Sequence, residues 1–237
     1  MRARTLITSV LTSLLALLPA RASEDHLVPR EDRSEVRNYY GALAKKLIVT
    51  PTDYGRFLVL RSPASVGEDS VALWSNAAGF QLTYTKASRN IYYSLMSPND
   101  PVYRGAVTTA RIDAPISASA AAAVRRAWTV MLQNISPRRE PLRQIIIHGE
   151  VYEFSIGARR PVVGAAIEGQ TGRNASEMIN IGRLLIDYSR ATLPRRQSIA
   201  REIERRATRL ATRVEAARQK RPNQTMQATA GRSDAPL

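Results

Sequence analysis

Apolar residues gather in QIIIHGEVYEFSI, residues 144–156, in a pattern that predicts a β-hairpin. With Gly149 and Glu150 as the two loop residues, Ile147 faces Tyr152. This register gathers five apolar side chains on one face: Ile145, Ile147, Tyr152, Phe154 and Ile156. A glycine at the first loop position suits a type II′ turn. We therefore expect this hairpin to lie at the centre of the core.

Short runs of β-branched and aromatic residues predict a sheet between residues 51 and 112. In FQLTYTK, residues 80–86, apolar and polar residues alternate, which is typical of an antiparallel sheet with one face in water. We expect residues 70–75 to form a hairpin with this run. The strand-like runs are 56–61, 70–75, 80–86, 90–96 and 106–112.

Apolar residues at helical spacing predict four helices, in residues 31–47, 117–134, 174–190 and 195–218. Ser117 or Ser119 can cap the second helix. Asn174 and Glu177 have the spacing of a capping box at the start of the third. The glycine-punctuated segment 157–172 is expected to be a loop.

These elements predict an α+β fold, in which an antiparallel sheet of about five to seven strands is covered by two or more helices. The covering helices are 117–134 and 174–190, and a basic C-terminal helix follows them.

The first 22 residues have the order of regions typical of a secretory signal peptide. A basic start, MRART, precedes an apolar run at residues 6–18, and Ala20-Arg21-Ala22 forms a cleavage site. The apolar run is shorter than the roughly 20 residues that a membrane-spanning helix needs. We expect a mature chain that begins at Ser23, has no transmembrane span and is periplasmic or secreted.

The expected organisation has five parts: a signal peptide (1–22), a leader with the N-terminal helix (23–50), the α+β domain (51–192), a basic helix (193–221) and a tail (222–237). The tail, PNQTMQATAGRSDAPL, lacks an apolar period and should be disordered.

The chain has no cysteine. Its core must therefore be held by burial alone, and thiol nucleophiles and thiolate metal sites are excluded.

Much of the net charge of +15 lies in residues 195–221, which hold ten basic residues against three glutamates. This segment has no aromatic residue for stacking on bases, so we expect no nucleic-acid partner. Three alternatives remain open: a solvated helix that rests on the domain, a partner helix, or contact with an anionic surface. The candidate residues for such a contact are Arg201, Arg205, Arg206, Arg209 and Arg213.

Candidate chemistry is sparse. His148 beside Glu150 and Glu153 could form an acid–base pair, although in the predicted register His148 flanks a turn and Glu153 is exposed. The two histidines of the chain lie too far apart to predict a metal site. GAAIEGQT, residues 164–171, resembles a phosphate-binding loop, but Gln170 stands where that motif needs a lysine. We expect no cofactor and no metal.

Three segments in this order resemble exported proteobacterial proteins of uncharacterised function. They are DAPISASAAAAVRRAWTVML (113–132), GEVYEFSI (149–156) and EGQTGRNASEMINIGRLLIDY (168–188). The resemblance extends over residues 54–190 and implies export and this fold, with no activity or site attached. The matching positions are Trp128, Met131, Leu132, Gly149, Tyr152, Phe154, Thr171 and Gly172.

The sequence thus favours a non-catalytic exported protein with a binding or structural role, whose partner is an anionic envelope surface or another envelope protein. The alternative is an envelope-directed hydrolase with its site near His148. An open cleft with converging carboxylates around His148 would favour the enzyme, whereas a turn on a convex surface would favour the binding protein.

Overall fold

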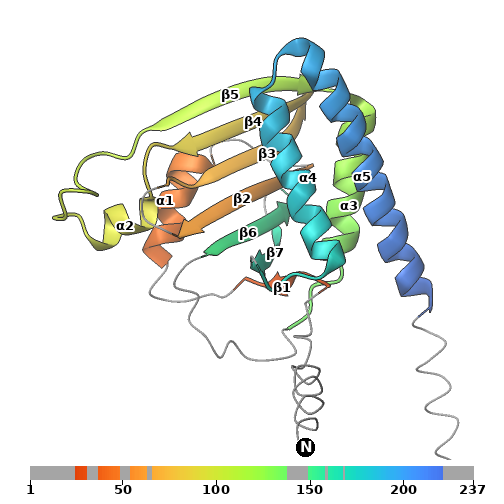
Figure 1. Cartoon of the computed structure of the whole chain (residues 1–237), viewed down its shortest axis with the longest axis horizontal. Helices are drawn as coiled ribbons and strands as arrows, with labels where there is room; N and C mark the ends of the chain where they lie inside the picture. Colours follow the sequence, from red (N-terminus) through yellow and green to blue (C-terminus); the bar gives the residue numbers. More distant parts are fainter. Residues whose placement is uncertain are drawn as a thin grey trace, which may run out of the picture.

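Figure 1 shows the computed structural model of the chain. The structure describes residues 25–30, 37–48, 54–62, 66–137, 149–157, 160–167 and 169–220. In this part of the chain a seven-stranded antiparallel sheet carries helices on both faces, which confirms the predicted α+β fold.

The strands lie in the order β1-β7-β6-β2-β3-β4-β5, and every neighbouring pair is antiparallel. The predicted hairpin of 70–75 with 80–86 is confirmed as β3 and β4, with Leu73 paired to Leu82. The strands are β1 (Val28–Pro29), β2 (Gly55–Ser62), β3 (Asp69–Asn76), β4 (Gly79–Ala87), β5 (Thr109–Ile116), β6 (Gly149–Ile156) and β7 (Val162–Ile167).

Helices α3 and α4 cover one face of the sheet, which we call the α3–α4 face, and α5 packs on the outside of both. Helix α1 lies on the opposite face, the α1 face, with α2 beside it at one end of the sheet. The helices are α1 (Arg37–Leu47), α2 (Ile91–Met96), α3 (Ala118–Leu132), α4 (Arg173–Arg190) and α5 (Leu193–Lys220).

The main core fills the space between the sheet and helices α3 and α4. Because side chains alternate across a strand, Tyr152 and Phe154 of β6 share this face with Phe57 of β2. The ring of Phe57 lies 5.7 Å from that of Tyr152 and 5.1 Å from that of Phe154. Trp128 of α3 meets Phe154 edge-on at 5.4 Å, and its indole N–H donates to the carbonyl of Arg56. Helix α3, which is Ala-rich in its first half, contributes the buried Ala120, Ala121, Ala123 and Ala127.

A second, smaller core joins α1 to the other face of the sheet. Leu43 and Leu47 of α1 pack with Leu58 of β2, and Ala87 and Ile91 close the cluster near α2. The predicted N-terminal helix is thus confirmed from Arg37 onward and binds the face opposite to α3 and α4.

The predicted central hairpin is corrected by the pairing of β6. Gly149 and Glu150 are the first residues of this strand and pair with the end of β2, so they are not turn residues. Because β2 and β7 occupy the two edges of β6, the predicted pairing of Ile147 with Tyr152 is wrong. The expected first arm, 144–147, lies outside the described residues.

Residues 90–96, predicted as a strand, contain helix α2 instead. Asn90 caps it, since its side-chain oxygen accepts from the N–H of Tyr93 at 3.1 Å. The Glu68 carboxylate accepts from the N–H of Ile91 at 2.8 Å. These two side chains satisfy amides that a strand would have used in a ladder, so the β propensity of IYYSLM is overridden.

Two short strands also replace predicted loops. Segment 157–172 contains β7, and the leader, for which no strand was predicted, supplies β1, which pairs with β7. A Cβ at Gly164 would lie 2.9 Å from Leu27, so glycine permits this close approach. Helix α4 begins after Gly172 without a side-chain cap of its own, and the predicted capping box is wrong. Asp25 of the leader instead accepts from the N–H of Asn174.

Candidate functional site

The residues predicted for an acid–base site are not brought together. Glu150 and Glu153 lie three positions apart on β6, so they project from opposite faces of the sheet. Glu150 shares the α3–α4 face with Tyr152, whereas Glu153 lies on the α1 face beside Leu58. His148 lies outside the described residues.

Glu150 belongs to a partly exposed ion pair with α4. Arg183 places a guanidinium nitrogen 3.3 Å from the Glu150 carboxylate, and Tyr152 donates its hydroxyl to the same carboxylate. The Arg183 guanidinium also lies 5.3 Å from the centre of the Tyr152 ring. An ion pair at this exposure contributes about 0–1 kcal/mol, and it fixes α4 relative to β6.

Glu153, expected to be exposed, is 5 % exposed and buried beneath α1. The hydroxyl of Tyr40 donates to its carboxylate at 2.5 Å, and the Arg30 guanidinium lies 4.4 Å from the Tyr40 ring centre. Burial raises the pKa of the Glu153 carboxyl above its usual 4.5, against the opposing effects of the Tyr40 hydrogen bond and the Arg30 charge.

A second buried carboxylate, Glu68, lies beneath the same helix. The hydroxyl of Tyr39 donates to Glu68 at 3.1 Å, and the N–H groups at the start of α2 donate to it as well. Burial raises the pKa of Glu68, and burial together with the Glu68 charge raises the pKa of the Tyr39 hydroxyl. The rings of Tyr39 and Tyr40 lie 5.6 Å apart. We call Tyr39, Tyr40, Glu68 and Glu153 the acid–tyrosine network.

Sequence reasoning missed most of this network. Glu68 stands in a Gly-Glu-Asp segment that reads as an exposed turn, and the two tyrosines read as the apolar side of a helix. Carboxylates with raised pKa values mark candidate functional sites. Here, however, Glu68 closes the start of α2, and Glu153 ties α1 to β6. The network therefore has the geometry of a structural support.

The raised pKa values predict a pH-dependent stability. Below pH 4.5 the carboxyl groups of Glu68 and Glu153 are protonated, and their contribution to the stability of the fold is fully present. That contribution is lost as the pH rises through the raised pKa values that the two groups have in the folded protein. The free energy of unfolding should therefore fall with pH above 4.5. Glu153→Gln should flatten that slope in denaturant titrations, because glutamine keeps an acceptor for Tyr40 and does not titrate.

Glu202→Gln is the matched control for this experiment. Hydrogen bonds from Arg205 and Arg206 lower the pKa of Glu202 to about 2, so its stabilisation is present above pH 4.5 and is lost only in stronger acid. Glu202→Gln should change the pH dependence of the free energy of unfolding only below pH 4.5. Above pH 4.5 the slope of that free energy against pH should be the same as in the unmodified chain. An unchanged slope in Glu153→Gln would contradict the prediction.

The basic helix α5 rests on the domain, as one of the three alternatives predicted. Its apolar stripe packs against α3 and α4. Glu177 of α4 binds Arg206 of α5, and Glu215 of α5 binds Arg126 of α3. The buried residues of the stripe are Ile199, Ile203, Ala207, Leu210, Ala211 and Val214.

The five arginines proposed for anion contact separate into two groups. Arg206 lies 3.2 Å from Glu177 and 2.6 Å from Glu202, and Arg205 also binds Glu202. Arg213 donates to the side chain of Asn174. Arg201 donates only to the Gln197 carbonyl of its own helix, and Arg209 is exposed with no hydrogen bond or ion pair in the described part of the chain. The predicted patch is thus reduced to these last two cations.

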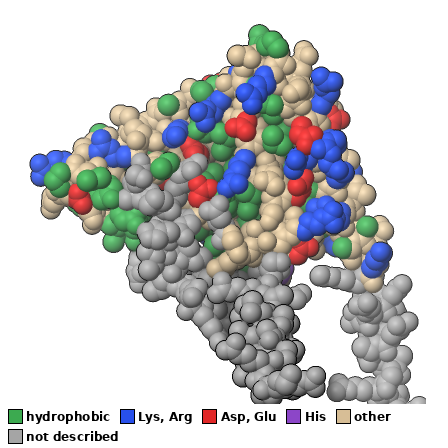
Figure 2. Space-filling view, in the orientation of Figure 1, with side chains coloured by type: hydrophobic (Ala, Val, Ile, Leu, Met, Phe, Trp, Pro, Cys, Tyr) green, Lys and Arg blue, Asp and Glu red, His purple; other side chains and the backbone are tan. Residues whose placement is uncertain are grey.

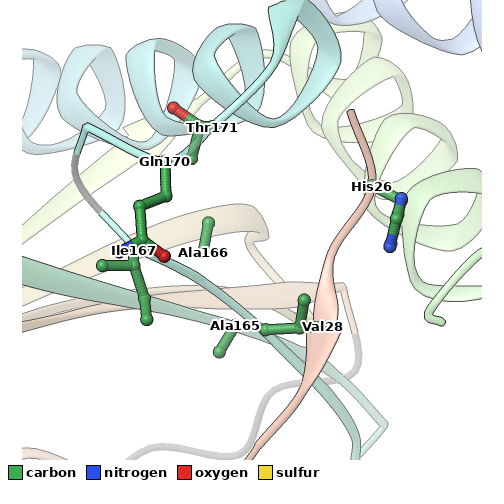
Figure 3. A pocket seen from close by; sticks show the side chains of 7 residues that line it. All are labelled: His26, Val28, Ala165, Ala166, Ile167, Gln170 and Thr171. Carbon is green, nitrogen blue, oxygen red and sulfur yellow. The ribbon is translucent and has the colours of Figure 1, made fainter. Parts of the chain in front are cut away.

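A small pocket lies where β1, β7 and the start of α4 meet (Figure 3). The cavity has a volume of about 10 Å³, which suits a single water molecule. The pocket is therefore too small for a substrate. Its lining residues are His26, Val28, Ala165, Ala166, Ile167, Gln170 and Thr171.

Exposed apolar side chains gather at the α2 end of the molecule (Figure 2). Tyr92 is 37 % exposed, Leu95 45 %, Met96 60 % and Val102 68 %. We call these four residues the α2 tip. The sequence pattern did not predict this cluster, because a strand at 90–96 would have divided Tyr92, Leu95 and Met96 between two faces of a sheet.

Neither a metal site nor a membrane span is found in the part of the chain that the structure describes. There, no three His, Asp or Glu side chains lie close enough together to hold a metal ion. Within the same ranges, no helix is both long and apolar enough to cross a membrane. Comparisons with family models, curated proteins and solved structures find no match to this chain.

Proposed function

We propose that this chain is an exported, non-catalytic protein of the cell envelope that acts by binding. The observation that carries the proposal is the α2 tip, where four apolar side chains of a well-packed domain stay in water. Exposed apolar residues that cluster rather than scatter are typical of interaction sites.

The arrangement of the acidic groups supports a non-catalytic role. A hydrolase needs an acid and a base within reach of one reacting bond. Glu150 is held by Arg183 and Glu153 by Tyr40, on opposite faces of the sheet, and Glu68 is hydrogen bonded to the start of α2. Each of these carboxylates is bound by side chains or amides that hold the fold together, and no two of them converge on one site. The described residues therefore give the hydrolase alternative no support.

The envelope assignment comes from the N-terminal sequence. The basic start, the apolar run at 6–18 and the Ala20-Arg21-Ala22 site have the order of a secretory signal. A mature chain from Ser23 would then meet the membrane surfaces and proteins of the envelope.

Cell fractionation tests this proposal. The full-length chain, expressed in a bacterium, should be recovered without its first 22 residues and bound to the envelope fraction. Leu95→Ser/Met96→Ser should shift it to the soluble periplasmic fraction, because these side chains contribute much of the exposed apolar surface of the tip. Recovery of the intact Met1 form in the cytoplasm, or equal envelope binding by both forms, would overturn the proposal.

A further inference from the structure

We infer that the α2 tip binds the interface of an anionic phospholipid bilayer. This inference rests on the proposed binding function and names the partner of that surface. Three features of the tip carry it: its anchoring, its flanking charge and its shape.

The tip is built on a firmly anchored base. Ile91 is buried in the smaller core, and Tyr92 packs edge-on against Tyr39 of α1 with 5.5 Å between ring centres. Glu68 and Asn90 accept from the first amides of α2. With this end of the helix fixed, Leu95 and Met96 in its last turn remain 45 % and 60 % exposed. Such a support presents apolar side chains at little further cost in conformational entropy.

The loop that follows α2 brings Val102 to the same end of the molecule. Tyr93 stacks on Tyr103 with ring centres 5.3 Å apart, which holds the loop against the helix. Asp100 accepts from the N–H of Val102 at 2.9 Å and so closes the turn. The apolar side chains of the helix and the loop are therefore displayed together.

Basic side chains flank the tip. Arg89 donates to the carbonyl of Arg104, and Lys46 of α1 donates to the carbonyl of Val107 at 2.9 Å. Arg104 itself is exposed, and its side chain makes no hydrogen bond or ion pair in the described residues. Asp100 is the acidic residue of the loop, and Glu68, bound to the start of α2, is fully buried. Among the charged side chains named here that reach the surface, three cations therefore stand against one anion. Figure 2 shows Lys and Arg side chains beside the hydrophobic ones at this end. This charge complements anionic headgroups.

The shape of the tip favours a bilayer over a protein partner. Figure 1 shows α2 and its loop projecting from one end of the sheet, away from α3, α4 and α5. A stable protein interface buries about 800 Å² on each partner, which is far more than four partly exposed side chains supply. A bilayer interface requires no minimum buried area, because the binding free energy grows with each apolar side chain that enters it. Tyrosine side chains are also favoured at the level of the lipid headgroups.

Co-sedimentation with vesicles tests the inference. The chain from Ser23 should bind phosphatidylcholine vesicles that contain phosphatidylglycerol and bind pure phosphatidylcholine much less. Binding should weaken between 0.1 M and 1 M salt, as the Debye length falls from about 10 Å to about 3 Å. Leu95→Ser/Met96→Ser should weaken binding by about tenfold, because less apolar area is removed from water.

A matched pair of charge variants locates the contact. Arg104→Gln at the tip and Arg209→Gln on α5 each remove one exposed cation that makes no described hydrogen bond. Arg104→Gln should reduce the preference for phosphatidylglycerol, and Arg209→Gln should leave it unchanged. Unaltered circular-dichroism melts would show that the variants remain folded.

Three outcomes would overturn the inference. They are no binding to anionic vesicles, a loss of binding in Arg209→Gln but not in Arg104→Gln, and a dimer in sedimentation that Leu95→Ser/Met96→Ser dissociates. The proposed function has its own test. Envelope binding that depends on the tip, together with no vesicle binding, would leave that function standing with a protein partner.

Discussion

Phe154→Ala is expected to lower the free energy of unfolding by about 3–5 kcal/mol, the range for removing a buried aromatic ring from a core. Phe154 is 0 % exposed, and its ring contacts those of Phe57 and Trp128 at 5.1 and 5.4 Å. The substitution would leave a cavity between the sheet and α3, and neither element can easily move to fill it.

Ser155→Ala is the control for this substitution. Ser155 is the next residue of β6, lies on the opposite face and is partly exposed, so its truncation should cost less than about 1 kcal/mol. Urea titrations of the two variants give the comparison. Equal losses at both positions would contradict the placement of Phe154 in the core.

The alternation in VYEFSI was enough to place Tyr152 and Phe154 on one apolar face, because a strand's period of two is a local property. The neighbours of that strand were not predictable in the same way. β2 lies almost a hundred positions earlier in the chain, and β7 is a short run, VVGAAI, in a glycine-punctuated segment. Three adjacent isoleucines offered a nearer partner, so a local hairpin was predicted in place of the long-range pairing.

The candidate site was harder to predict than the fold, for a related reason. A carboxylate after a glycine, such as Glu68, is usually solvated, and nothing in its neighbourhood indicates that it will meet Tyr39 and the amides of α2. The same holds for Glu153, whose partner Tyr40 comes from helix α1, more than a hundred positions earlier in the chain. Burial of these acids follows from the packing of α1 and α2, which the sequence pattern leaves open.

The α5 helix illustrates the opposite case. Its thin apolar stripe, repeating with the helical period, was compatible with packing on the domain, which was one of the three alternatives and is the one the structure shows. The partners of its arginines depended on the rotation of α5 against α4, which sets Arg206 beside Glu177. A count of basic residues therefore overstates the charge that remains for an anionic partner, and the flanks of the α2 tip gain importance by comparison.

Gly182→Ala tests how closely α4 lies on the sheet. A Cβ at this position would stand 2.6 Å from ring atoms of Phe57, and that ring is 0 % exposed between its aromatic neighbours. Neither the ring nor the helix backbone can yield cheaply, so the substitution should destabilise the fold by about 1–3 kcal/mol. Thermal and urea unfolding would measure the loss.

Gly41→Ala supplies the matched comparison, since Gly41 also lies inside a helix, α1, but a Cβ there meets no atom within 4 Å. In that open position alanine should stabilise by about 0.5–1 kcal/mol, because glycine loses more backbone entropy on folding. Both substitutions make the same change in helix propensity, so their opposite signs would isolate the contact with Phe57. If Gly182→Ala stabilised the fold as Gly41→Ala should, α4 would have to lie farther from β2 than the structure places it.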